Sequence, residues 1–250
     1  MTEKIKIKNK SGLELTAFLD RHDTDKKQGM ALLIGGMGSD GTSWKYEKLR
    51  DLFLSLGYAV LRFSHRGCGE SAGDVRYATT TAGLEDLEAL LHYVRNLNWV
   101  DQSKIGFYGN SYGGGLVNLY VARHPGFQFM ILTSPCIDTK NRYDTDPTVD
   151  LNQWQKTQWL TSGWPDRHYS VYTDACLYFP YNEAAKTSLP TLIIHGEKDE
   201  IIPVTQSEKL HTILNESKFI KLPQTKHQYN DQDFQIIIHE IQTWMKSSVL

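Results

Sequence analysis

The chain has 250 residues, of which 40% are hydrophobic and 22% are charged, and its formal net charge is −2 at pH 7. This length and apolar content suit one α/β domain with a modest insertion. The near-neutral charge, without any run of Lys and Arg, excludes an electrostatic basis for binding nucleic acid or an anionic membrane surface.

The N-terminal segment predicts a β-hairpin. Residues 4–8 and 13–19 alternate apolar and polar side chains, and a turn-forming Asn-Lys-Ser-Gly sequence lies between them. The opening MTEKIKIKNK lacks the apolar run of a signal peptide, and no later stretch reaches the length of a membrane span. We therefore expect a cytoplasmic protein that does not cross a membrane.

From residue 30 onward, short continuous apolar runs alternate with segments whose apolar residues have helical spacing. Such runs are typical of strands buried on both faces, and they occur at residues 30–34, 58–63, 105–108, 129–133, 191–194 and 219–222. Helices are expected over residues 49–56, 84–94, 111–123 and 234–245. Thr205-Gln-Ser-Glu208 has the spacing of a capping box and predicts a further helix start. This order indicates an α/β fold with a mostly parallel central sheet and helices on both faces.

Residues 137–185 interrupt the alternation, because they are rich in Trp, Tyr, Asp and Thr and show no clear period. We expect them to form a cap inserted into a core of residues 1–136 and 186–250. Aromatic side chains can wall a pocket over an acyl chain or a phenolic ring, although a single one more often only packs the cap. Trp164 and Tyr169 are the cap aromatic residues expected to contact a substrate.

A candidate nucleophile lies between an expected strand and an expected helix. Gly109-Asn-Ser111-Tyr-Gly113 matches G-x-S-x-G in the strand–turn–helix context that exposes a serine hydroxyl. The strained turn needs small residues two positions before and two after the serine, and both are glycine. Ser111 is therefore the candidate nucleophile, and the N–H of Tyr112 at the helix start is a candidate oxyanion donor. The alternative is a glycine-rich turn with an incidental serine, which this context disfavours.

A serine hydroxyl needs a general base, and His227 is placed to supply it. His227 follows the last expected strand, and a loop at that position can return to the carboxyl edge of the sheet, where the serine turn also lies. The other histidines considered have a simpler interpretation as surface residues or as satisfied core residues: His22, His92, His124, His211 and His239.

The acid that orients the histidine is expected after the strand at 191–194, because the order in this arrangement is serine, acid, histidine. Glu197, Asp199 and Glu200 all lie there. Asp199 is the preferred candidate. Its short side chain lies between a glycine turn and the apolar Ile-Ile-Pro segment, and is therefore expected to be more firmly positioned than the side chains of the two glutamates. Asp138, which follows an earlier strand, is the second candidate.

The loop after the first buried strand supports two different functions. Gly35-Gly-Met37-Gly can supply a second oxyanion donor, for which the N–H of Met37 is the candidate. The same loop contains G-x-G-x-x-G from Gly36 to Gly41, which is the dinucleotide-binding pattern. The next strand ends in Arg62-Phe-Ser-His-Arg66, which suits the 2′-phosphate of NADP. An NADP-dependent oxidoreductase is therefore the rival, but it leaves Ser111, Asp199 and His227 unexplained.

Taken together, these motifs resemble the α/β-hydrolase superfamily. The resemblance rests on segments that occur in the same order in this chain: Gly36-Met37-Gly38, Arg66-Gly-Cys-Gly-Glu-Ser71, Gly109-Asn-Ser-Tyr-Gly113, His195-Gly-Glu-Lys-Asp199 and His227. The chain is most similar to bacterial carboxylesterases of the feruloyl and cinnamoyl esterase type and to the monoacylglycerol lipase and serine aminopeptidase group. The sequence departs from the usual pattern at Gly35, Ser64 and Asn110.

The resemblance implies a hydrolase of carboxylic esters, with a small-molecule ester as substrate and with no cofactor and no metal. Thioesterase and peptidase activities remain compatible with it. It also implies that the cap from Asp138 to Tyr181 lines the acyl pocket, which makes Asp138 a candidate substrate contact beside Trp164 and Tyr169. A catalytically silent binding protein with this fold is a third possibility.

The cysteines are few and widely spaced, at positions 68, 136 and 176. This spacing predicts free thiols in a reducing cytoplasm, rather than a disulfide framework or a zinc site. The oligomeric state, the identity of the substrate and the movement of the cap stay open at this level.

Overall fold

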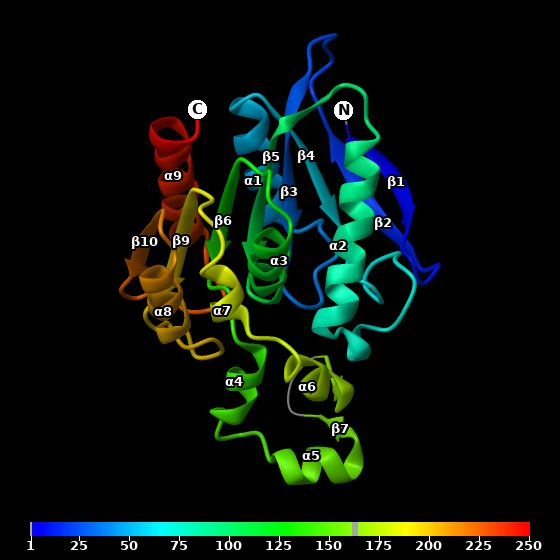
Figure 1. The fold of residues 1–250 in the computed structure, drawn as a ribbon, viewed down its shortest axis with the longest axis vertical. Helices are drawn as coiled ribbons and strands as arrows, with labels where there is room; N and C mark the ends of the chain where they lie inside the picture. The colour runs from blue at the N-terminus through cyan, green and yellow to red at the C-terminus, as the bar shows by residue number, and fades with distance from the viewer. Residues whose placement is uncertain (1, 162–164) are drawn as a thin grey trace.

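An eight-stranded sheet forms the centre of the computed structural model, which describes residues 2–161 and 165–250 (Figure 1). Its strands are β1 (Thr2–Lys8), β2 (Glu14–Asp20), β3 (Gln28–Ile34), β4 (Tyr58–Phe63), β5 (Val100–Asn110), β6 (Phe129–Thr133), β9 (Thr191–Gly196) and β10 (Ser217–Leu222). They follow the order β1-β2-β4-β3-β5-β6-β9-β10. The β1–β2 hairpin and the β2–β4 pair are antiparallel, and all the other pairs are parallel. The predicted hairpin and the mostly parallel sheet are confirmed.

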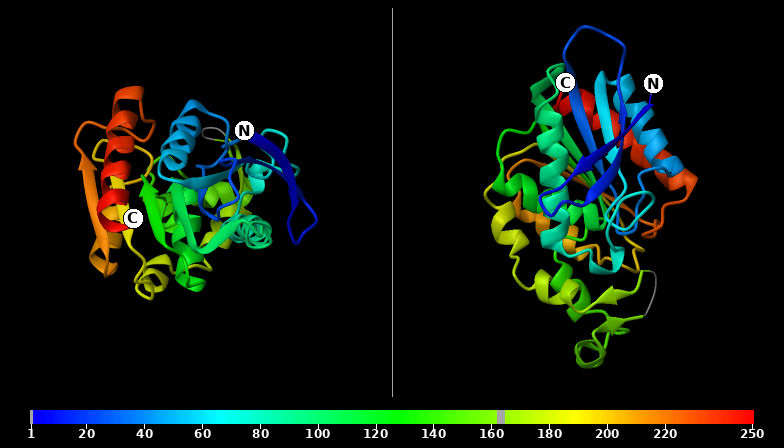
Figure 2. Two further views of the ribbon diagram at one scale, coloured as in Figure 1. Left: turned by 90° about the horizontal axis from the view of Figure 1, so that it is seen from above. Right: turned by 90° about the vertical axis from the view of Figure 1, so that its right-hand side faces the viewer.

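Helices cover both faces of the sheet, as Figure 2 shows from above. One face carries α2 (Thr80–Arg95), α3 (Tyr112–Arg123) and α8 (Thr205–Ile213), and the other carries α1 (Trp44–Ser55) and α9 (Asp231–Ser248). Strand β3 shows why both faces must be covered. Its side chains alternate between the two apolar layers, with Leu32 and Ile34 in one layer and Ala31 and Leu33 in the other.

The capping box expected at the start of α8 is wrong. Thr205 is the first helical residue, the N-cap position is Val204, and no side chain caps the helix there. The turn begins at Pro203, whose carbonyl accepts from the backbone N–H of Gln206. Proline fixes φ near its helical value and favours a helix start one residue earlier than the capping pattern implies. Glu208 instead pairs with Lys221 of the neighbouring strand.

A group of short elements lies beyond the carboxyl ends of the parallel strands (Figure 1). They are α4 (Thr139–Asp144), α5 (Leu151–Thr157), β7 (Trp159–Leu160), β8 (Arg167–His168), α6 (Ser170–Ala175) and α7 (Pro180–Ala184). Four buried residues of this region, Tyr143, Trp154, Leu160 and Val171, form a small hydrophobic cluster separate from the two layers on the sheet. The cap is thus held together largely by its own side chains.

The cap joins the core at a few polar contacts. Buried Gln206 accepts from the backbone N–H of Asp138 and donates to the carbonyl of the same residue, at 2.9 and 3.1 Å. Asp174 accepts hydrogen bonds from Thr81 at the start of α2. The return to the core begins with α7, because Ala184 packs in the same cluster as α3.

Two properties bear on the expectations from composition. The cysteines at positions 68, 136 and 176 are free, as predicted. Among the helices within residues 2–161 and 165–250, none has both the length and the apolar composition needed to cross a bilayer.

Candidate active site

Ser111 occupies a strained turn between β5 and α3. Its backbone has φ 50° and ψ −120°, a conformation that side-chain-bearing residues rarely adopt. The turn is tight because glycines surround it. A Cβ atom at Gly109 would lie 2.7 Å from the Cα of Gly114, and one at Gly113 would lie 2.3 Å from the carbonyl oxygen of Gly35. Both glycines are therefore steric requirements of this turn, as the G-x-S-x-G interpretation predicts.

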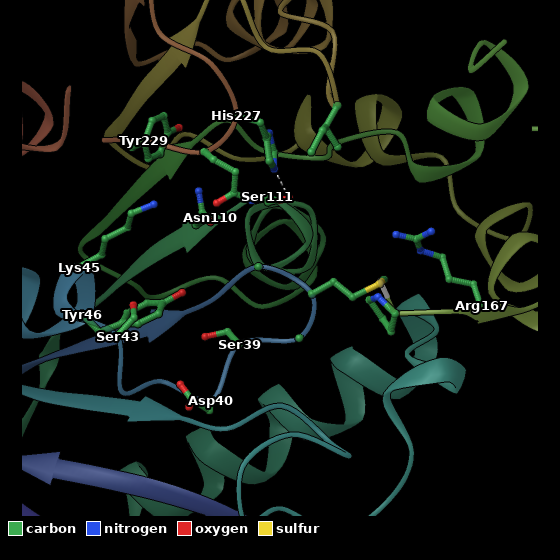
Figure 3. Close-up of a pocket in the computed structure, with 16 residues that line it drawn as sticks. Ser39, Asp40, Ser43, Lys45, Tyr46, Asn110, Ser111, Arg167, His227 and Tyr229 are labelled. Atoms are coloured by element: carbon green, nitrogen blue, oxygen red, sulfur yellow. Dashed lines mark hydrogen bonds between the residues drawn. The ribbon is translucent and has the colours of Figure 1, made fainter. Parts of the chain in front are cut away.

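The structure brings Ser111, His227 and Asp199 together, although they come from three separate loops. His227 Nε2 lies 3.0 Å from Ser111 Oγ, a contact drawn as a dashed line in Figure 3, and His227 Nδ1 lies 2.7 Å from Asp199 Oδ2. His227 follows β10 and Asp199 follows β9, whose carboxyl ends are neighbours in the sheet. The three side chains thus form a continuous chain of hydrogen bonds. In this arrangement His227 can accept the proton of Ser111, and Asp199 can orient His227.

Asp199 is held as an ionised, fully buried carboxylate. Its Oδ1 accepts from the backbone N–H groups of Ile201 and Ile202, at 2.9 and 2.8 Å. Burial alone would raise its pKa, but hydrogen bonds from His195 and His227, the charge of His227 and the Ile202 N–H hold the pKa well below the ordinary range. An ionised carboxylate only accepts, so His227 Nδ1 carries a proton and Nε2 is left to accept from the Ser111 hydroxyl.

A second histidine also binds this carboxylate, and the sequence interpretation gave it no role. His195 is fully buried at the end of β9, and its Nε2 lies 3.1 Å from Asp199 Oδ2 and 3.0 Å from the Ile202 carbonyl. Both neighbours are acceptors, so Nε2 carries the proton and donates to them. His195 Nδ1 then accepts from Ser207 Oγ at 2.7 Å. The signal in the sequence was the position of His195, four residues before the acid at the end of a buried strand.

The two expected oxyanion donors lie on either side of the serine turn. Tyr112 is the first residue of α3, so its N–H has no intrahelical acceptor. Its side chain turns away, and the hydroxyl donates to the Thr79 carbonyl at 2.7 Å. Met37 lies on the loop after β3, next to Gly36, where a Cβ atom would be 3.4 Å from Ser111 Cβ. The loop therefore lies against the serine, where a second N–H donor is needed.

A cavity of about 430 Å³ opens beside Ser111 and His227. Core residues such as Tyr46, Asn110 and Tyr229 line most of it, and Pro165 and Arg167 extend from the cap. Most of these side chains are polar, as Figure 3 shows. Within the described residues, the cavity thus combines polar side chains with two tyrosine rings, Tyr46 and Tyr229, beside the candidate nucleophile.

Two of the expected substrate contacts of the cap, Asp138 and Tyr169, lie away from this cavity. Asp138 accepts from the backbone N–H of Asn141 and caps α4. Tyr169 packs against Trp154 and Tyr172, with ring centroids 5.7 Å away in each case. Neither Asp138 nor Tyr169 is among the residues that line the cavity in the described part of the chain. Trp164 lies outside the described residues.

The structure does not support the dinucleotide hypothesis. Arg66, the expected partner of a 2′-phosphate, donates to Asp86 through Nε at 2.8 Å and through Nη2 at 2.6 Å. Helix α1 starts only at Trp44, so its N-terminus does not adjoin Gly36 as a pyrophosphate site requires. The Gly36–Gly41 pattern instead forms a loop in which Gly41, at φ 72°, lies tightly against β4.

No group of three or more His, Cys, Asp or Glu side chains suited to a metal ion occurs within residues 2–161 and 165–250. His195, Asp199 and His227 are instead occupied by one another. The site offers a candidate nucleophile, a candidate base, a candidate acid and candidate backbone donors.

Comparison with known proteins identifies the family. The model of the prolyl oligopeptidase family of peptidases matches residues 32–248. The chain belongs to the prolyl oligopeptidase family. The match covers β3 to α9 and therefore includes Ser111, Asp199 and His227.

The relatives of this prolyl oligopeptidase family member include proteins named as a lipase and as a peptidase. This chain is 25% identical over 262 residues to a monoacylglycerol lipase of Mycolicibacterium smegmatis, with 90% of each chain covered. It is also 25% identical over 232 residues to a probable dipeptidyl-peptidase 5 of Emericella nidulans, with 87% of this chain but only 31% of the relative covered.

The structure of Est1E from Butyrivibrio proteoclasticus with bound ferulic acid superimposes with a TM-score of 0.88. The two chains are 22% identical, with 98% of this chain and 99% of that chain covered. This likeness shows that the fold is that of an α/β hydrolase. The family match makes the protein a hydrolase.

Proposed function

We propose that the protein is a serine hydrolase that cleaves carboxylic esters of small or medium acyl or aryl substrates through an acyl-enzyme. The observation that carries the proposal is the continuous hydrogen-bond sequence from Ser111 through His227 to Asp199, at 3.0 and 2.7 Å. The fold does not require these three side chains to be hydrogen-bonded to one another, whereas acyl transfer does.

In the proposed first step, His227 Nε2 takes the proton of the Ser111 hydroxyl while Oγ attacks the ester carbonyl carbon. Asp199 stabilises the imidazolium that forms and keeps its Nδ1 proton directed inward. The N–H groups of Met37 and Tyr112 donate to the oxyanion of the tetrahedral intermediate. The imidazolium then returns its proton to the leaving alcohol oxygen as the ester bond breaks, which leaves an acyl group on Ser111.

In the second step a water molecule repeats this chemistry. His227 takes a proton from the water, the hydroxide attacks the acyl carbon, and the proton passes back to Ser111 Oγ as the acid leaves. The strained backbone of Ser111 supports this cycle because it fixes the hydroxyl beside the imidazole. Asn110, the preceding residue, is fixed too, since its amide donates to the Thr133 carbonyl at 3.0 Å.

A fluorophosphonate probe tests the proposal directly. The wild-type protein is expected to react and to carry the label on Ser111, as peptide mapping would show, and Ser111→Ala is expected to lose it. A panel of p-nitrophenyl esters of increasing acyl length, with a hydroxycinnamate ester, a thioester and an amino-acid amide, then ranks the substrate classes. A folded wild-type protein without labelling or turnover would favour the catalytically silent binding protein instead.

A further inference from the structure

The cavity beside Ser111 carries an excess of positive charge. Lys45 lies on one side of it and Arg167 on the other, as Figure 3 shows, with Ser111 and His227 between them. Asp40 is the carboxylate among the described lining residues, and its Oδ1 accepts from the backbone N–H of Thr42. Two cationic side chains and one anionic side chain leave the lining with a formal charge of +1, on the basis of a neutral His227.

Lys45 is half-buried and is not neutralised by a carboxylate within the described chain. Its ammonium lies over aromatic rings, 5.4 Å from the centroid of Tyr229 and 5.6 Å from that of Trp44. Burial lowers its pKa, so an anion placed nearby would relieve a real desolvation cost. The rings thus hold the ammonium by cation–π contacts, and Figure 3 shows it directed toward Asn110 at the cavity.

The neighbouring Lys48 shows what a neutralised lysine on the same helix looks like. It also lies over the Trp44 ring, at 5.1 Å, but it forms an ion pair with Asp231 of α9 and faces away from this cavity. The lack of a carboxylate partner is therefore specific to Lys45 and is not shared by Lys48 on the same helix.

Arg167 provides the second positive charge. Its Nε atom is buried and has no hydrogen-bond partner within residues 2–161 and 165–250. The backbone of Arg167 is fixed, because its carbonyl accepts from Trp154 Nε1 at 3.1 Å within the cap cluster. A buried guanidinium nitrogen without an acceptor costs free energy, so this side chain is held in place at that cost.

We propose that the cavity selects esters that carry a carboxylate group, and that Lys45 binds this carboxylate while the ester carbonyl lies at Ser111 and Arg167 adds positive charge from the opposite side of the cavity. The inference rests on the proposed function and defines its substrate class. A carboxylate would make charge-assisted hydrogen bonds to the Lys45 ammonium. An uncharged ester would leave this ammonium without an anionic partner. Lys45 and Arg167 thus act as specificity-determining residues.

Two pairs of esters that differ in one charge test the proposal. The first pair is 4-acetoxybenzoate and 4-acetoxybenzamide, with the charge on the leaving group. The second is monomethyl adipate and dimethyl adipate, with the charge on the acyl part. The wild-type enzyme is expected to show a kcat/KM at least about tenfold higher for the anionic member of one pair. The preference is expected to fall as NaCl is raised, because salt screens charge attraction.

Lys45→Met keeps much of the side-chain length but removes the charge. It is expected to lower kcat/KM for the anionic ester about tenfold, mainly through KM, and to lower kcat/KM for the neutral ester much less, so that the preference between the two esters falls. Lys45→Arg is expected to restore most of the preference. Lys48→Met is the matched control, because it removes an equivalent charge from the same helix outside the cavity. Arg167→Gln is expected to act in the same direction as Lys45→Met.

Three outcomes would overturn the proposal: equal or better turnover of the neutral member in both pairs, an equal loss on both members in Lys45→Met, or an equal effect from Lys48→Met. Labelling of Ser111 by the fluorophosphonate probe distinguishes these results from failure of the proposed function. A labelled enzyme without the charge preference contradicts only the substrate class. An unlabelled, folded enzyme that cleaves none of the four esters contradicts both.

Discussion

His195 Nε2 lies 3.1 Å from Oδ2 of Asp199, the same oxygen that accepts from His227 Nδ1 at 2.7 Å. One carboxylate oxygen thus receives two imidazole donors, and the other receives two backbone N–H groups. This places His195 as a positioning residue that acts through Asp199 rather than on the substrate. His195 is itself held in place, because it is fully buried and hydrogen-bonded to Ser207. It therefore fixes the orientation of the Asp199 carboxylate.

Replacing His195 by Phe is expected to shift the pH profile of the enzyme. Without this donor the Asp199 carboxylate is less stabilised and attracts the protonated form of His227 more strongly. The acid limb of kcat/KM should therefore move to higher pH by up to about one unit, because a hydrogen bond to a charged group contributes about 1.5 kcal/mol. Profiles of kcat/KM against pH measure this shift.

His211→Phe is the matched control for that measurement. His211 also bonds a serine through Nδ1, at 2.7 Å from Ser217 Oγ, but it does not contact Asp199. Its replacement should leave the acid limb in place. An unchanged limb in His195→Phe, despite a folded enzyme, would show that His195 only packs the strand end.

Asp199→Asn is expected to lower kcat by about 10³- to 10⁴-fold while Ser111 and His227 stay in place. The amide presents a donor where the carboxylate accepted, so His227 loses the tautomer that leaves Nε2 free. Glu200→Gln, a change at an exposed neighbour, should retain full activity. The rate of fluorophosphonate labelling and steady-state turnover report both variants. Loss of activity in Glu200→Gln with retention in Asp199→Asn would reverse the assignment of the acid.

The ionised Asp199 also makes stability depend on pH. Its pKa is held well below the ordinary range in the folded chain, with burial opposing and the hydrogen bonds from His195 and His227 lowering it. The unfolded chain protonates this carboxyl near pH 4, so its stabilising contribution is present above that pH and is lost as the pH falls further. Urea unfolding at pH 5 and pH 3 should show a smaller loss of unfolding free energy in Asp199→Asn than in the wild type. Asp25→Asn, at an exposed aspartate, should match the wild type.

Gly113→Ala is expected to lower the free energy of unfolding by roughly 2 to 3 kcal/mol, because the new methyl group would overlap the carbonyls of Ile34 and Gly35. Gly126→Ala is the control, because it introduces backbone strain without a steric clash. Gly126 has φ 100° with open space around its Cβ position, so its replacement should cost only about 1 to 2 kcal/mol. Chemical denaturation measures both, and a larger loss at Gly126 would show that the turn at Ser111 relaxes.

The sequence was most informative where local chemistry and chain order agree. Continuous apolar runs located the strands, and 58–63 and 129–133 match β4 and β6 residue for residue. The serine turn could be predicted because only glycine fits two positions before and two positions after Ser111, at Gly109 and Gly113. The positions of Asp199 and His227 followed from strand order, since loops after neighbouring parallel strands meet at one edge of the sheet.

The features that the sequence did not reveal depend on packing between distant segments. Lys45 and Lys48 both lie in α1 and cannot be distinguished by sequence until α9 is seen to supply a carboxylate to Lys48. His195 is a strand residue whose role depends on which acid turns toward it. Tyr169 was expected at the substrate, but an aromatic side chain in a short cap packs first with other aromatic side chains. Such choices are made by tertiary contacts, which residue spacing alone does not encode.

The separate apolar cluster of Tyr143, Trp154, Leu160 and Val171 has an evolutionary consequence. These four side chains pack with one another rather than with the two layers on the sheet, so changes among the surface residues around them are expected to leave the packing of the sheet intact. Selection can therefore remodel entry to the reaction centre while the machinery beneath it stays constant.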